Sequence, residues 1–193
     1  MNATARLSTT KPEAAARLLE LIQMRLISEA IHVAAALGVA DLLAAGPKSA
    51  DELSKATRAS APSLGRVMRA LASFGIFSHD SADRFALAPL GEFLKPGSLH
   101  NAALLFGGET GTSTVRLLLE CVKTGLSATP MLTGGKGSFE WVQSDPELTK
   151  LFNAVMTSFS ALHLTGLLEA YDFPKSKRSL MWVEVTERFF PRF

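Results

Sequence analysis

The sequence predicts a mainly α-helical protein that opens with a winged helix-turn-helix and continues as a helical segment. Three observations support this fold class. Apolar residues recur at helical spacing from Leu18 to Ala35. Short helical patterns separated by glycine, proline and serine follow as far as Gly75. Two short strand patterns then flank the polar turn 80–83, and this order of elements is that of a winged helix with a β-hairpin wing.

The first helix is expected to begin at Lys11-Pro12 and to end at Gly38, because proline suits the first turn of a helix and glycine the position after its last turn. Its apolar positions cover a wide arc. A wide arc predicts two buried faces, one against the helix's own domain and one against a partner. Residues 1–10 are polar and are expected to be disordered.

The rest of the winged helix is read from caps and turns. Ser49 and Glu52 form a capping-box pattern at the start of one helix, and Pro62 lies in the first turn of the next. Asp80 and Asp83 are typical turn residues of the wing. The expected elements are three helices, two strands and a final helical turn, over residues 39–46, 50–57, 60–75, 76–79, 84–87 and 88–94. Together with the first helix they predict one domain over residues 11–98.

Residues 99–173 have a helical pattern throughout. Helices are expected at 100–106 and 112–124, followed by a loop at 126–137 and a helical turn at 138–142. A long helix should begin after Asp145, a suitable N-cap, and run to Phe159, with a further helical stretch at 161–171.

Composition restricts the function classes. The 20 basic residues nearly balance the 18 acidic ones, whereas a dedicated nucleic-acid binder usually has a clustered basic face. No stretch has the roughly 18 apolar residues of a membrane span, and the N-terminus lacks a signal-peptide pattern. Cys121 is the single cysteine, which excludes an internal disulfide, and a cytoplasmic location is expected. The four histidines have no metal-ligand spacing and are expected to be structural: His32, His79, His100 and His163.

Four segments, in this order, resemble the S-adenosylmethionine-dependent O-methyltransferases of small molecules, such as the caffeate, acetylserotonin and polyketide enzymes. They are 31–43, 63–71, 84–91 and 145–156. The resemblance implies that the winged helix forms a homodimer and does not read DNA. It implies that residues 99–173 are a linker and cap over a small-molecule substrate. S-adenosylmethionine would be held by a Rossmann-like second half, which also supplies the catalytic base.

The candidate substrate-binding residues follow mainly from this resemblance. Phe152, Met156 and Phe159 recur at i, i+4 and i+7 on one helix face, a pattern that by itself usually reflects core packing. The resemblance implies that Phe152 and Met156 line an aromatic substrate's pocket, while Phe159 falls where some relatives have a histidine. The same alignment adds Leu105, Phe106, Ser138 and Val142.

The tail, residues 174–193, departs from the family. No glycine follows Gly166, so the glycine-rich cofactor turn is not found in it. Met and Trp have one codon each, so Met181-Trp182-Val183 must be encoded ATG TGG GTN. Read one base earlier, the same bases contain the codons GTG and GGT, which encode Val-Gly, a pair that also occurs in that turn. We therefore expect an out-of-frame tail in place of the Rossmann-like domain, with no cofactor site, catalytic residue or methyl transfer in the isolated chain. The alternative is an ordinary amphipathic strand; sequencing the gene downstream of codon 170 decides between them.

Two other functions stay open at this point. The chain could be a winged-helix transcription regulator, because Arg58, Arg66 and Arg69 could contact DNA phosphates, although the wing is acidic at Asp80 and Asp83. It could also be a non-catalytic dimerisation partner of a full-length enzyme.

Overall fold

The computed structural model describes residues 10–170, with side chains up to Leu164. The expected disorder of residues 1–10 falls almost wholly outside this range, and the expectations for the tail, residues 174–193, fall entirely outside it. The described residues divide into two units, the first ending at Val155 and the second beginning at Met156.

The first helix, α1 (Lys11–Ala36), has the predicted bounds. Pro12 lies in its first turn, and Thr10 and Glu13 form a capping box there. The Thr10 amide donates a hydrogen bond to the Glu13 carboxylate at 2.7 Å, which lowers the pKa of Glu13. The chain leaves the helix through Gly38, whose φ of 62° is the left-handed conformation that glycine adopts most easily.

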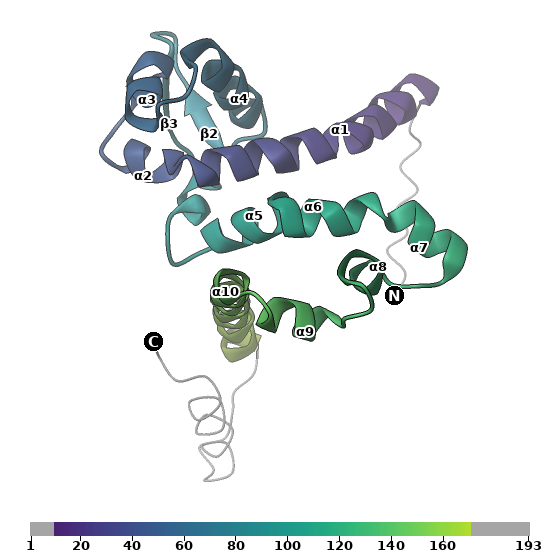
Figure 1. Ribbon diagram of the computed structural model, residues 1–193. Helices are drawn as coiled ribbons and strands as arrows, with labels where there is room; N and C mark the ends of the chain where they lie inside the picture. Colours follow the sequence, from purple (N-terminus) through teal and green to yellow (C-terminus); the bar gives the residue numbers. More distant parts are fainter. Residues whose placement is uncertain (1–9, 171–193) are drawn as a thin grey trace. The chain divides into compact units, whose positions relative to one another are not determined.

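The predicted winged helix is confirmed. Its elements are α2 (Val39–Ala44), β1 (Lys48–Ser49), α3 (Ala50–Thr57), α4 (Ala61–Ser73), β2 (Phe77–His79), β3 (Arg84–Leu87) and the short 3₁₀ helix η1 (Gly91–Leu94). The strands form an antiparallel sheet in the order β1-β3-β2, in which Phe77 pairs with Leu87 and Lys48 with Phe85. Leu53, Met68 and Phe85 are fully buried in the core beneath this sheet. In Figure 1 the other elements of the winged helix lie along one side of the second half of α1, and the first half of α1 extends beyond them.

The helices that follow are α5 (His100–Gly107), α6 (Glu109–Arg116), α7 (Leu118–Thr124), α8 (Ala128–Thr133), α9 (Ser138–Gln143) and α10 (Pro146–Ala170). Asp145 is the predicted N-cap of α10, since its carboxylate accepts hydrogen bonds from the amides of Glu147 and Leu148. Helix α5 packs along α1 (Figure 1) and thereby joins the helical segment to the winged helix.

Three sequence-based expectations in this segment were wrong. The single helix expected over 112–124 is two helices that meet at Leu117. The hydroxyls of Thr112 and Thr114 donate to carbonyls three or four residues earlier, which bends helices. The loop expected over 126–137 contains α8, which ends at the left-handed Gly134. The break expected near residue 160 does not exist, because α10 runs without interruption to Ala170.

Within residues 10–170, the helices are all too short or too polar to cross a membrane. The same residues bring together no group of three or more histidine, cysteine, aspartate or glutamate side chains suited to hold a metal ion.

Candidate functional site

Helices α1 and α5 approach each other closely at Gly107. A Cβ atom at this position would stand 2.3 Å from the Cβ of His32, so only glycine fits. The His32 ring contacts the same helix, and its Nδ1–H donates to the carbonyl of Ala103 at 3.2 Å. The two helices are therefore held at a fixed spacing here.

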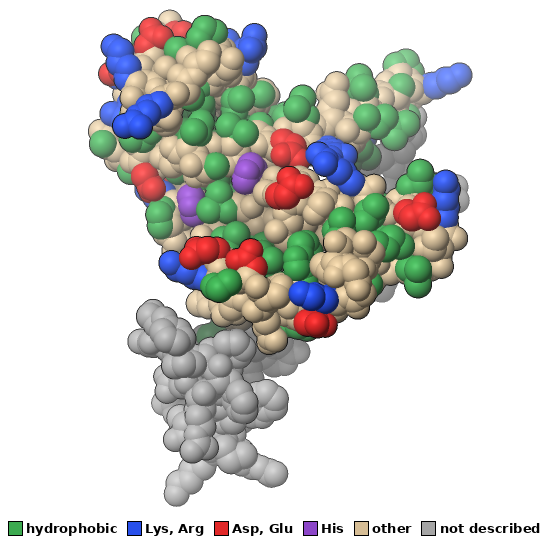
Figure 2. All heavy atoms as spheres, viewed as in Figure 1, with side chains coloured by type: hydrophobic (Ala, Val, Ile, Leu, Met, Phe, Trp, Pro, Cys, Tyr) green, Lys and Arg blue, Asp and Glu red, His purple; other side chains and the backbone are tan. Residues whose placement is uncertain are grey.

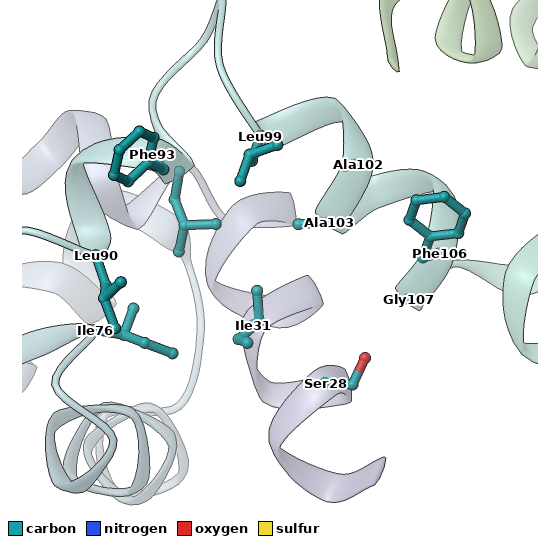
Figure 3. A pocket seen from close by; sticks show the side chains of 11 residues that line it. Ser28, Ile31, Ile76, Leu90, Phe93, Leu99, Ala102, Ala103, Phe106 and Gly107 are labelled. Carbon is teal, nitrogen blue, oxygen red and sulfur yellow. The ribbon is translucent and has the colours of Figure 1, made fainter. Parts of the chain in front are cut away.

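An apolar cavity of about 390 Å³ lies next to this contact, between α1, η1 and α5. Figure 3 shows the side chains around it, with Ser28 and Ile31 from α1, Phe93 from η1, Leu99 from the residue before α5, and Phe106 from α5. Among the side chains that line the cavity, the Ser28 hydroxyl is the only polar group. The volume is in the usual range of small-molecule pockets, about 300–1,000 Å³.

Two histidines fix the walls of the cavity. The His100 Nδ1–H donates to the carbonyl of Leu94 at 3.1 Å, and this ties the start of α5 to η1. The bond from His32 to Ala103 ties α5 to α1. Leu94 and Ala103 both line the cavity, so the hydrogen bonds position its walls. This agrees with the structural role expected for both histidines.

Of the predicted substrate-binding residues, Phe106 is the one that lines the cavity. Its side chain is 53% exposed. Its neighbour Leu105 is buried on another face of α5 and does not reach the cavity.

Three other predicted residues lie on α9 and α10. The Ser138 hydroxyl donates to the Thr129 hydroxyl at 3.1 Å, which joins α9 to α8. The carbonyl of the half-buried Val142 accepts a hydrogen bond from the Thr149 hydroxyl at 2.7 Å, which joins α9 to α10. The half-buried Phe152 meets the ring of Phe139 edge-on, with the ring centroids 6.2 Å apart. Ser138 and Val142 therefore take part in hydrogen bonds between neighbouring helices.

Met156 and Phe159 are half-buried on the part of α10 that belongs to the second unit, which begins at Met156. Their role in substrate binding stays a prediction.

Sequence reasoning missed most of the cavity wall. Ile31 and Phe93 have the helical spacing of ordinary core residues. They are far apart in the sequence, so no sequence pattern indicates that both line a cavity beside α5. The polar Ser28 in the otherwise apolar stretch of α1 was the available signal.

The outer face of α1 is a second notable surface. An apolar stripe follows it, comprising Leu18, Leu19, Ile22, Leu26 and Val33, with exposed fractions from 37% at Val33 to 70% at Leu26. We call it the outer stripe of α1; hydrophobic side chains are visible at the surface along the first half of this helix in Figure 2. Ala30 and Ala34, one and two turns after Leu26, belong to the core. The apolar arc of α1 is therefore buried in part by its own domain and exposed in part, mainly in the first half of the helix.

The acidic groups of the wing have local structural contacts. Asp80 accepts hydrogen bonds from the amides of Ala82 and Arg84, and Asp83 pairs with His79 at 2.6 Å. Glu52 lies 3.1 Å from the Arg84 guanidinium. The pKa of Glu52 is lowered by the hydrogen bond from the Ser49 amide and, to a smaller extent, by Arg84.

The chain resembles known proteins both in sequence and in structure. The family profile of the O-methyltransferase dimerisation domain matches residues 19–96. The phenazine O-methyltransferase PhzM of Lysobacter antibioticus is 32% identical over 83% of this chain and 47% of its own length. The O-methyltransferase SfmM3 of Streptomyces lavendulae is 36% identical over 79% of this chain and 46% of its own. The crystal structure of LaPhzM superposes with a TM-score of 0.75 at 32% identity, covering 83% of this chain and 48% of that one.

The chain spans about half the length of the curated relatives it matches, and the match includes the winged helix and the helices after it. Residues 19–96 match the O-methyltransferase dimerisation domain, and the chain is similar to the N-terminal half of small-molecule methyltransferases.

Proposed function

We propose that this chain is the dimer-forming and substrate-covering part of a small-molecule O-methyltransferase. The observation that carries the proposal is the match to such enzymes over about four-fifths of the chain, well beyond the dimerisation domain itself. The helices after the winged helix would otherwise need a different explanation.

The outer stripe of α1 supports the homodimer. Exposed apolar surfaces of this extent usually mark an interaction site. A second copy that covers the stripe would bury the exposed part of the apolar arc of α1, in addition to the part already buried by its own domain.

The cavity beside Phe106 supports the substrate-covering role. Its lining is almost wholly apolar and includes two phenylalanine rings, which suits a flat aromatic molecule. A relative named for phenazine acts on such a planar ring system. We propose that the acceptor substrate's rings contact Phe106 and Phe93.

The cofactor S-adenosylmethionine is proposed to bind elsewhere in the enzyme. Methyltransferases of the Rossmann-like kind bind it at the carboxyl ends of parallel strands. The sheet that the described part of the chain contains is antiparallel and its strands are two to four residues long, so residues 10–170 do not fit the cofactor.

The proposal assigns no DNA-reading role to α4. Purified chain is expected to give no salt-dependent shift of duplex DNA in electrophoresis. A shift that weakens as salt rises and that is lost in Arg66→Ala would instead favour the transcription regulator.

Sedimentation equilibrium of the 193-residue chain tests the dimer. We expect twice the chain mass of 20.7 kDa. Leu26→Glu, which places a charge on the outer stripe, should give monomers. Arg17→Glu places the same charge on the opposite side of α1, nine residues and half a rotation from Leu26, at an exposed position, and should leave the dimer intact. A monomeric unmodified chain would contradict the proposal.

A further inference from the structure

Ser28 places a hydrogen-bonding group at one end of the cavity between α1, η1 and α5. It lies one turn before Ile31 on the same face of α1. In Figure 3 its hydroxyl, the red atom, is on the side of α1 that faces Phe106, and Phe93 lies at the opposite end of the cavity. All other side chains that line the cavity are apolar, so any polar group of a bound molecule has one side-chain partner here.

The fold itself does not use the Ser28 hydroxyl. Serine and threonine hydroxyls on other helices donate to backbone carbonyls three or four residues earlier, as at Ser73, Thr112 and Thr133. Within the described part of the chain, the Ser28 hydroxyl forms no such bond with its own helix and none with another residue. Its donor and its acceptor are therefore left to water or to a molecule that binds in the cavity.

The hydroxyl lies at the mouth of the cavity and not at its floor. Ser28 is exposed, whereas Ile76, Leu94 and Ala102 in the same lining are buried, with exposed fractions of 7–8%. A flat ring system would lie against the buried residues and present its edge to Ser28. The polar group of such a molecule is then expected on that edge.

The cavity also restricts the charge of a bound molecule. Its lining includes no lysine, arginine, histidine, aspartate or glutamate. A carboxylate that entered it would give up part of its hydration without gaining a cation, which is costly. An uncharged hydroxyl or carbonyl would instead exchange a hydrogen bond with water for one with Ser28.

The position of Ser28 relative to the other walls is fixed within the chain. The hydrogen bond from His32 to the Ala103 carbonyl holds α5 against α1, and the bond from His100 to the Leu94 carbonyl holds α5 against η1. The cavity therefore has its shape before any molecule enters it, which is the usual condition of a small-molecule site.

We infer that Ser28 is a specificity-determining residue, whose hydroxyl hydrogen-bonds to one uncharged polar group on the edge of the flat aromatic substrate. The inference rests on the proposed substrate-covering function. It adds to that function a residue that selects among aromatic molecules of the same shape by the polar group on their edge.

Equilibrium dialysis of the 193-residue chain at pH 7 against three matched ligands tests this role. Naphthalene, 2-naphthol and 2-naphthoate share one ring system and carry no polar group, an uncharged hydroxyl and a carboxylate. We expect 2-naphthol to bind about 3–10-fold more tightly than naphthalene, as one hydrogen bond allows. We expect 2-naphthoate to bind no more tightly than naphthalene.

Three variants assign the effect to the hydroxyl. Ser28→Ala should remove the advantage of 2-naphthol and leave the affinity for naphthalene unaltered, and Ser28→Thr, which keeps a hydroxyl, should preserve the advantage. Ser63→Ala is the matched control, because Ser63 is an exposed serine of α4 outside the cavity lining. Circular dichroism and sedimentation establish that each variant has the fold and assembly state of the unmodified chain.

The outcomes separate this inference from the proposed function. If naphthalene and 2-naphthol bind equally and both bind less tightly to Phe106→Ala, the cavity stands as the substrate site and the role of Ser28 is refuted. An advantage of 2-naphthol that survives Ser28→Ala also refutes it. Tighter binding of 2-naphthoate than of 2-naphthol overturns the preference for an uncharged group. If none of the three ligands binds, the cavity is not the substrate site and both proposals for it fail.

Discussion

Gly107→Ala tests the contact that fixes α5 against α1. The added Cβ would lie 2.3 Å from the Cβ of His32 and 2.9 Å from its Cγ. The His32 Cβ cannot rotate away, so one of the helices must shift. Overpacking of this kind costs about 1–3 kcal/mol. Alanine recovers less than about 1 kcal/mol of helix propensity at the last residue of α5. We expect a net loss of about 1–2 kcal/mol.

Urea unfolding at fixed protein concentration, followed by circular dichroism, measures this loss. Gly137→Ala is the matched control, because nothing lies within 4 Å of a Cβ there. A second pair of variants locates the clash. His32→Ala keeps the Cβ atom and should not rescue Gly107→Ala, whereas His32→Gly should rescue it, with a coupling of about 1–2 kcal/mol. Equal unfolding midpoints for Gly107→Ala and Gly137→Ala would refute the reasoning.

Three further predictions concern the caps and the cavity. Ser49→Ala removes the N-cap of α3 and should cost about 1 kcal/mol, seen as a melting temperature lower by roughly 2–4 °C; an unchanged value would show that the cap is not needed. Glu52 has a lowered pKa in the folded chain, so its carboxylate stabilises the fold at any pH above the ordinary glutamate pKa of about 4.3. This stabilisation is lost as the pH falls through the lowered pKa of the folded state. Glu52→Gln should therefore be less stable than the unmodified chain at pH 7 and equal to it in strong acid, and a difference that persists in acid would contradict this. Phe106→Ala should weaken the binding of 1-hydroxyphenazine, a planar probe, by about 2–10-fold in titration calorimetry, and unaltered affinity would remove the cavity from the proposed substrate site.

The sequence was sufficient for the winged helix because its signals are local. The bounds of α1 follow from Pro12 and Gly38, and the start of α10 follows from Asp145. Each of these residues acts through its own backbone or the adjacent turn.

Sequence patterns did not predict the elements that depend on contacts between distant residues or on side-chain hydrogen bonds to the backbone. The two-residue strand β1 forms because Lys48 pairs with Phe85, which no periodicity within two residues can reveal. The break at Leu117 depends on hydroxyl-to-carbonyl bonds that compete with a continuous helix.

The candidate site was predictable only in part. Phe106 was identified through the family resemblance, yet the cavity beside it also needs Ile31 and Phe93, which come from two other elements. The other predicted substrate-binding residues are located by the structure, but their contact with a substrate stays a prediction. Leu105 in particular is buried away from the cavity.

A chimeric enzyme tests the central claim most directly. Residues 1–170 of this chain would replace the matched N-terminal segment of the Lysobacter phenazine O-methyltransferase, which keeps the rest of its own sequence. The assay is transfer of a labelled methyl group from S-adenosylmethionine to a hydroxyphenazine, after circular dichroism and cofactor binding have established folding. We predict a dimeric, active chimera whose activity falls with Leu26→Glu. A folded chimera that binds the cofactor but transfers no methyl group would contradict the assignment of this chain as the dimer-forming and substrate-covering part of such an enzyme.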